Sequence, residues 1–431
     1  MTKYQPVIGL EIHVELTTAS KMFCQCPADY FGKAANSQVC PVCLGLPGAL
    51  PVPNEKAIKY CQLIGLALGC KINKISKFDR KHYFYPDLPK GYQISQYDEP
   101  LCIEGQLTVY NPATHQESTH AITRVHMEED TGKLIHKGEE SLVDFNRSGV
   151  PLVEIVTEPD FDNVENVKAF LKELQVIVRE LGVSNADMEK GSMRLEPNIS
   201  LRLKSENKLP TYKVEVKNIN SFNFVKKAIE YEIKRQTEIL EAGNVPDQET
   251  RGFNENKGIT FTQRSKEYAH DYRYFPEPDI PPMEFDQKYL NNLKNNLPKM
   301  PKGKKQDYLQ LGLSQTEAYL IAYDQNLRQK FESLLTYAKP REIAKIIINK
   351  RQLSLEEIKK AIKRSKTKVE TNQGELEEKI DQVINNNQKA VNDYKNGKEN
   401  ALMFLTGQVM KEMKGEADAN IVKKKLQERL K

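Results

Sequence analysis

The sequence predicts an α+β protein in which a large mixed α/β domain, holding a zinc-binding element, precedes all-helical domains. Three observations lead to this fold class. Short β-rich runs alternate with turn clusters up to about residue 295, a set of cysteines near the start has the spacing of a zinc site, and the sequence beyond residue 295 reads as helical. We therefore expect an α/β domain at residues 1–293, a helical domain at 294–372 and a C-terminal helical domain at 373–431.

The first strand is expected at residues 9–16, which read Gly-Leu-Glu-Ile-His-Val-Glu-Leu. Successive side chains of a strand point to opposite faces, so the aliphatic residues form one face while Glu11, His13 and Glu15 form the other. Two carboxylates that flank an imidazole are typical of a ligand site. The alternative is an amphipathic edge strand with a solvated polar face.

The rest of the α/β part follows from similar signals. Amphipathic helices are expected at 163–181 and 222–242, the second ended by Gly243. The Pro-rich segment 275–282 is expected to be a rigid extended linker that closes the domain. Further β-rich runs lie at 92–96, 106–110, 121–125, 150–156, 199–202 and 213–216.

In the helical part, helices are expected at 354–364 and 375–388. The segment Thr371-Asn372-Gln373-Gly374 between them is a plausible boundary between two subdomains. An apolar run at 402–410 then precedes a final basic helix.

Carboxylates in two later segments join those of the first strand. His126 is followed by Glu128, Glu129 and Asp130, whose like charges repel unless cations or water compensate them. Glu154 lies inside the β-branched run 150–156, and a buried carboxylate must be paired, protonated or bound to metal.

Arg147 offers a pairing alternative for Glu154, and each acidic residue taken alone is more often structural. Together these residues resemble a site for a hard divalent cation such as Mg²⁺, which prefers oxygen ligands and leaves positions for water and phosphate. The candidate residues are Glu11, His13, Glu128, Glu129 and Glu154.

The cysteines give the more specific signal. Cys24 and Cys26 are followed, after thirteen residues, by Cys40 and Cys43, a separation suited to one tetrahedral zinc with four sulfur ligands. Such a closed site is structural and not catalytic, and the alternative is a disulfide pair. The other cysteines, Cys61, Cys70 and Cys102, are most simply buried thiols.

Composition indicates a cytoplasmic protein with a charge division. Hydrophobic residues make up 39% of the 431 residues, and the start has neither an apolar signal core nor an Arg-rich transit helix. No apolar run approaches the length of a membrane span. Residues 301–431 hold 27 Lys and Arg against 18 Asp and Glu, a net of +9, whereas residues 1–300 hold 37 against 41, a net of −4. A basic helical part suits a nucleic-acid partner, although Lys-rich helices are often merely solvated.

Longer blocks carry a family resemblance. Residues 9–16, 83–96, 144–152 and 270–279 closely resemble the B subunit of the aspartyl/glutamyl-tRNA amidotransferases, the GatB family, and residues 404–410 onward resemble that family's tail domain. The resemblance implies a catalytic cradle domain at 1–293 and a tRNA-binding tail at 373–431. It also implies a reaction in which ATP phosphorylates the side-chain carboxylate of Glu-tRNA(Gln) or Asp-tRNA(Asn) and ammonia displaces phosphate to give the amide.

The resemblance implies roles for particular residues. His13, Glu128 and Glu154 match the family's magnesium ligands, with Glu11 and Glu129 at an adjacent cation position, and His13, Glu11, Glu128 and Glu154 are the expected catalytic residues. No Gly-x4-Gly-Lys-Ser/Thr phosphate loop is present, so ATP binding does not follow from a motif. The candidates to hold nucleotide or the tRNA acceptor end are Arg80, Lys81, Tyr83, Tyr85 and Lys90, for whose tyrosines the alternative is packing in a sheet.

The chain shows no ammonia source, because it lacks a Gly-x-Ser-x-Gly elbow and a recognisable glutaminase cysteine. The resemblance implies two protein partners, an amidase that supplies ammonia and a small third component of the amidotransferase. Two hypotheses compete with this one: a non-catalytic zinc-ribbon protein that binds tRNA, and a Mg²⁺-dependent nuclease.

The chain departs from the family pattern in three places. Glu196 stands where the family more often carries Asp, the zinc cysteines are absent from many members, and the region 335–375 is shorter than usual. None of these departures touches the expected magnesium ligands.

Overall fold

The computed structural model describes residues 3–111, 116–265, 272–367, 373–413 and 417–430. The chain forms two compact units, residues 1–301 and 302–431, and each is described by itself. Parts of two sequence features lie outside the described residues: His270 and Asp271 of the family-like block, and Thr371 and Asn372 of the expected boundary.

Among its described residues, the first unit contains the strands and four helices. The strands are β1 (Tyr4–Glu15), β2 (Lys71–Ile72), β3 (Ile75–Ser76), β4 (Asp79–His82), β5 (Tyr92–Ser95), β6 (Cys102–Asn111), β7 (Gln116–Glu129), β8 (Lys133–Lys137), β9 (Glu140–Asp144), β10 (Pro151–Thr157), β11 (Met193–Leu203), β12 (Val214–Lys217), β13 (Glu249–Asn254), β14 (Ile259–Ser265), β15 (Phe275–Pro276) and β16 (Met283–Glu284). The helices are α1 (Glu55–Ala67), α2 (Val164–Glu180), α3 (Phe222–Glu241) and α4 (Gln287–Asn295).

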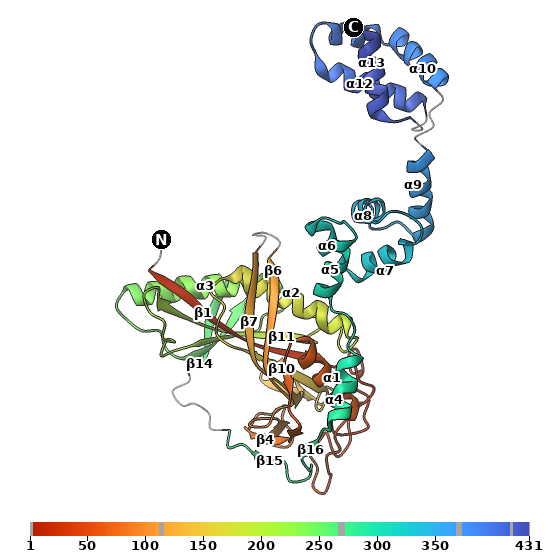
Figure 1. Cartoon of the computed structure of the whole chain (residues 1–431). Coiled ribbons are helices and arrows are strands. Elements are labelled where there is room, and N and C mark those ends of the chain that lie inside the picture. The colour runs from red at the N-terminus through yellow and green to blue at the C-terminus, as the bar shows by residue number, and fades with distance from the viewer. Residues whose placement is uncertain (1–2, 112–115, 266–271, 368–372, 414–416, 431) are drawn as a thin grey trace. The chain divides into compact units, whose positions relative to one another are not determined.

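A nine-stranded sheet organises this unit, with the order β14-β13-β12-β11-β1-β10-β7-β6-β2. Strand β1 lies near its middle and pairs antiparallel with β10 on one side and β11 on the other. Helices α1, α2 and α3 pack against the sheet through β6, β7 and β11 (Figure 1). This leaves the middle of the opposite face to polar side chains.

Side-chain alternation explains how β1 is placed. Leu10, Ile12 and Val14 are at most 1% exposed and belong to the main core of this unit. The polar residues between them point to the opposite face. The expected strand and its two chemically distinct faces are therefore observed.

The two predicted helices are present with nearly the predicted bounds, and side-chain caps fix where they begin. Asn163 accepts a hydrogen bond from Asn166 N at the start of α2, and Ser221 accepts one from Phe224 N at the start of α3. Gly243 follows α3 with a φ of 83°, a left-handed conformation that favours glycine.

Two features differ from the sequence prediction. Helix α1, capped by Asn54, was not predicted. The segment 275–282 is not a rigid extended linker: Phe275 pairs with Arg80 of β4 as an edge strand, and the chain turns at residues 278–280, where Ile280 N donates to Glu277 O at 3.3 Å. Proline is tolerated at such an edge because no ladder hydrogen bond is lost.

The second unit is helical throughout its described residues, as predicted. Its helices are α5 (Pro301–Gln310), α6 (Gln315–Ala322), α7 (Gln325–Leu334), α8 (Pro340–Asn349), α9 (Leu355–Thr367), α10 (Gln373–Asn386), α11 (Gln388–Lys395), α12 (Glu399–Glu412) and α13 (Ala419–Leu430). One apolar core is formed by residues between Tyr308 and Ile362, and another by residues between Leu376 and Leu430. The α+β class is confirmed, while the bounds of the three domains stay predictions.

Candidate metal and active site

Sheet register brings distant polar residues together on the face opposite the helices. His13 of β1 lies directly opposite Glu154 of β10, which in turn lies opposite His126 of β7. Glu128, two residues beyond His126, projects from the same face of β7. Three neighbouring strands thus present two imidazoles and two carboxylates to one another.

The distances define a compact cluster. His13 Nε2 lies 3.6 Å from Glu154 Oε2 and 3.8 Å from Glu128 Oε2, and one ligand atom from each of the three residues falls within 4.8 Å of the others. Glu128 is 2% exposed and Glu154 is 6% exposed. Two buried carboxylates this close repel each other unless positive charge lies between them, so the donor set fits a hard divalent cation.

The electrostatics agree with that donor set. Burial alone would lower the pKa of His13, but its interaction with Glu154 and the charges of the neighbouring carboxylates outweigh burial and raise that pKa to about 9. Burial alone would raise the pKa of Glu154, yet His126 and His13 hold it well below its usual range. The negative field of the carboxylates, which retains protons on the imidazoles, would also attract a metal ion. Protons and metal therefore compete for this cluster.

Strands β4 and β5 supply partners that orient Glu128. Ser95 Oγ donates a hydrogen bond to Glu128 Oε1 at 2.7 Å, and Gln93 Nε2 donates one to Glu128 Oε2 at 3.2 Å. Lys81 Nζ lies 3.5 Å from Glu128 Oε1. A cation therefore stands at the edge of the carboxylate cluster.

Sequence reasoning did not assign a role to His126, Gln93 or Ser95. His126 Nε2 lies 3.3 Å from Glu154 Oε2, and its buried Nδ1 has no hydrogen-bond partner among the described residues. Its two-residue separation from Glu128 was the available signal, because residues i and i+2 of a strand share a face.

Among the predicted nucleotide-binding residues, Lys81 lies beside the cluster and Arg80 does not. The guanidinium of Arg80 donates to both carboxylate oxygens of Glu277, at 2.6 and 2.7 Å, and its Cζ lies 4.3 Å from the centre of the Tyr92 ring. Arg80 thereby fastens strand β4 to the segment after β15.

The predicted tyrosines and Lys90 are placed differently. Tyr83 donates a long hydrogen bond of 3.5 Å to Gln93 Oε1, whereas Tyr85 is 58% exposed. Lys90 Nζ is paired with Glu129 Oε1 at 2.6 Å. None of these contacts tests a role in nucleotide binding, which stays a prediction.

The structure does not bring Glu129 to the cluster. It is adjacent to Glu128 in β7, so its side chain leaves the opposite face of the strand, where it pairs with Lys90 and lines a pocket with Cys24 and Cys43. Glu15 also has other partners, because its Oε1 accepts hydrogen bonds from Arg194 and Tyr30, each at 3.1 Å.

Glu11 belongs to a second acidic group. Its carboxylate and those of Glu196 and Glu215 offer oxygens within 4.8 Å of one another. Lys217 Nζ lies 2.8 Å from Glu196 Oε2 and 3.2 Å from Glu215 Oε1, while Asn198 Nδ2 donates to Glu11 Oε1 at 2.9 Å. Burial raises the pKa of Glu11, and the negative charges of Glu154, Glu215 and Glu196 raise it further.

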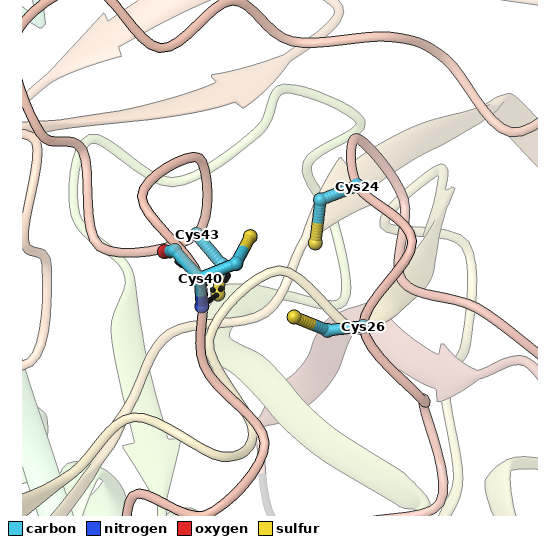
Figure 2. Close-up of side chains that lie close together, drawn as sticks. All are labelled: Cys24, Cys26, Cys40 and Cys43. Atoms are coloured by element: carbon cyan, nitrogen blue, oxygen red, sulfur yellow. Dashed lines mark hydrogen bonds between the residues drawn. The ribbon is translucent and has the colours of Figure 1, made fainter.

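The four cysteines form the remaining cluster. Figure 2 shows Cys24 and Cys26 on one loop and Cys40 and Cys43 on another, with the sulfur atoms directed toward the space between the loops. Their sulfurs lie within 4.8 Å of one another, and Cys40 Sγ is 3.8 Å from Cys43 Sγ. Zinc–sulfur bonds of about 2.3 Å in a tetrahedron place sulfurs about 3.8 Å apart. The donor set could therefore hold one metal ion, consistent with structural zinc.

Comparison with known proteins identifies the family. The model of the GatB/GatE catalytic domain matches residues 6–291, and that of a further GatB domain matches residues 330–430. The chain belongs to the GatB family. The aspartyl/glutamyl-tRNA(Asn/Gln) amidotransferase subunits B of Persephonella marina and Carboxydothermus hydrogenoformans are each 44% identical to it, and that of Thermotoga maritima is 41% identical. These matches cover 99–100% of this chain and of each relative.

Membership of the GatB family confirms the resemblance seen in the sequence blocks. The cluster of His13, Glu128 and Glu154, the second acidic group and the cysteine cluster all lie within the residues matched by the catalytic-domain family model. A non-catalytic zinc-ribbon protein is accordingly not favoured. Within the described residues, every helix is too short or too polar to span a bilayer.

Proposed function

We propose that this chain is the B subunit of a tRNA-dependent amidotransferase and performs its ATP-dependent step. The substrate is the misacylated end of Glu-tRNA(Gln) or Asp-tRNA(Asn). The observation that carries the proposal is the cluster of His13 with the buried carboxylates Glu128 and Glu154, on the sheet face away from helices α1, α2 and α3 of a GatB catalytic domain.

The chemistry requires activation because a carboxylate is a poor electrophile. An oxygen of the substrate carboxylate attacks the γ-phosphorus of ATP, the bond to ADP breaks, and an acyl phosphate results. Ammonia then attacks the carbonyl carbon, and the carbon–oxygen bond to phosphate breaks. The departing phosphate takes up the proton lost from nitrogen, so the products are the amide and hydrogen phosphate.

Magnesium, when bound, neutralises the phosphate oxygens and orients them for in-line transfer. His13, Glu128 and Glu154 would hold it, since they offer one nitrogen and two oxygen ligands from three rigid strands. Ser95 and Gln93 fix the rotamer of Glu128 through its two oxygens.

A second cation position is proposed at Glu11, Glu196 and Glu215. Glu196, which stands where the family more often carries Asp, would be one of its ligands. Lys81 is proposed to face the phosphoryl group that is transferred, because its ammonium already stands beside Glu128. Glu129 is left out of the ligand set because it pairs with Lys90 on the other side of β7.

The remaining parts of the proposal concern partners. The word subunit in the names of the relatives implies a multi-subunit enzyme. We propose that an amidase is the ammonia source and that a small third component completes the complex, in the cytoplasm. The helical unit, with its net charge of +9 over residues 301–431, would bind the tRNA body through phosphates. Zinc held by the four cysteines would be structural.

The test uses the purified complex with Glu-tRNA(Gln), labelled ATP, Mg²⁺ and no amide donor. Phosphate release that requires the acylated tRNA is the expected result, and uncharged tRNA is the control. Binding without phosphate release would favour the non-catalytic tRNA-binding hypothesis. Cleavage of the tRNA backbone would favour the nuclease instead.

A further inference from the structure

Lys21 is a fully buried cation beside the cysteine cluster. It is 0% exposed and is among the largest fully buried side chains of the described chain. Its ammonium donates to Gln38 O at 2.9 Å and to Phe145 O at 3.3 Å, and its third contact is Cys43 Sγ at 3.6 Å. No ion pair with a carboxylate joins Lys21 within the described residues.

Such a group needs a compensating charge. Burying an unpaired ammonium is unfavourable, and two carbonyl dipoles satisfy its hydrogen bonds without neutralising it. A zinc ion with four thiolate ligands has a net charge of −2, and one of those sulfurs is the third partner of Lys21. The positive charge of Lys21 and the net negative charge of a zinc tetrathiolate would therefore compensate each other.

We propose that Lys21 is a positioning residue of the zinc site: its ammonium donates to the Cys43 thiolate and supplies the counter-charge of the zinc tetrathiolate. The inference rests on the proposed zinc binding by the four cysteines. It goes beyond that proposal in two ways. It assigns a residue that is not a ligand to the metal site, and it links zinc binding to the contact between the cysteine loops and the segment before β10.

That junction joins the zinc element to the segment before β10. Phe145 O accepts a hydrogen bond from Lys21. Three residues later, Ser148 Oγ donates a hydrogen bond to Cys43 O at 3.1 Å. The neighbouring Gly149 O accepts from Met22 N at 2.7 Å. These contacts fasten the zinc element to the segment that leads into β10 and Glu154. Loss of zinc would leave an uncompensated charge at this place.

The first experiment measures zinc affinity of the full chain by competition with a chromophoric chelator. Lys21→Met keeps an unbranched side chain that is one atom shorter and removes its charge, and we expect zinc to bind about 10–100-fold more weakly. The matched control is Lys33→Met, which removes a half-exposed lysine of the same element and should change the affinity less than about twofold.

The second experiment separates charge from hydrogen bonding. Lys21→Gln retains N–H donors for the carbonyl oxygens but lacks the charge, so it should also weaken zinc binding. In cobalt-substituted protein, the sulfur-to-metal charge-transfer band should shift when the donor to Cys43 loses its charge. If Lys21→Gln binds zinc as tightly as wild type with an unshifted cobalt spectrum, the inference is overturned.

Thermal unfolding with and without zinc gives an independent readout. Removing zinc should lower the Tm of wild type more than that of the Lys21 variants, because only wild type then retains a buried, unpaired ammonium. Equal losses of Tm in wild type and variants would overturn the inference. Wild-type protein that holds no zinc would instead overturn the zinc site itself, so the two failures are distinguishable.

Discussion

Replacing Glu154 with glutamine tests the proposed active site most directly. The substitution keeps the shape of a side chain that is 6% exposed and removes one negative charge that lies 3.6 Å from His13 Nε2 and 3.3 Å from His126 Nε2. At an effective dielectric constant of about 20, unit charges at such separations interact by about 4–5 kcal/mol before desolvation is subtracted. The charge is therefore the main contribution of Glu154 to this cluster.

The same charge would stabilise a bound cation and, through that cation, the phosphoryl group during its transfer. Losing one preorganised electrostatic contact of this kind costs about 3–4 kcal/mol in the transition state, or a factor of about 10²–10³ in rate. We expect tRNA-dependent phosphate release from labelled ATP to fall by that factor in Glu154→Gln. Hydrolysis of glutamine by the complex should persist, because that chemistry is assigned to the amidase.

The matched control is Glu158→Gln, which removes an exposed carboxylate just beyond the end of β10 that accepts a hydrogen bond from Thr123 Oγ1 at 2.6 Å. It should keep the wild-type rate within about twofold. A Glu154→Gln enzyme that releases phosphate within about threefold of wild type would refute the reasoning. An equal loss of rate in Glu154→Gln and Glu158→Gln would also refute it, because the rate would then not depend on whether the carboxylate lies in the cluster.

Three further predictions concern metal and tRNA. Ser95→Ala, which removes the 2.7 Å hydrogen bond to Glu128, should raise the Mg²⁺ concentration for half-maximal activity about tenfold and leave the rate at saturating Mg²⁺ nearly unchanged; an unaltered Mg²⁺ titration would contradict it. Cys26→Ser should reduce zinc below one ion per chain by elemental analysis and lower the Tm, with phosphate release at permissive temperature within about threefold of wild type; full zinc content would count against the site. Deleting residues 373–431 should weaken tRNA binding and flatten its dependence on salt, and binding as tight as that of the intact complex at every salt concentration would remove the tail from the proposal.

Local patterns in the sequence predicted the strand faces well. The alternation in residues 9–16 separated the apolar side chains from Glu11, His13 and Glu15, and the structure has this division. The same rule, had it been applied to residues 126–130, would have joined His126 to Glu128 and separated Glu129 from both. Grouping consecutive carboxylates as one cation site ignored the pleat of the strand.

These patterns do not predict the pairing register of the strands. Alternation says which side chains share a face, but it does not say which strands are neighbours or which residues lie opposite one another. Glu11 meets Glu196 and Glu215 because β1, β11 and β12 are consecutive in the sheet, and this order comes from tertiary packing. Helix α1 was missed although Asn54 and the apolar spacing after it are a recognisable start signal.

The division of the sheet into two faces also decides which substitutions the fold can tolerate. Stability of the central strands comes chiefly from Leu10, Ile12 and Val14, which pack with the helices on the face away from the cluster. The polar face adds little apolar burial, and there the imidazoles of His13 and His126, which hold the pKa of Glu154 low, offset the repulsion between the carboxylates. Glu154→Gln removes this attraction together with one repelling charge, but it leaves the apolar core unchanged. We therefore expect the variant to fold with reduced stability, and a loss of phosphate release measured below its Tm reports on chemistry and not on unfolding.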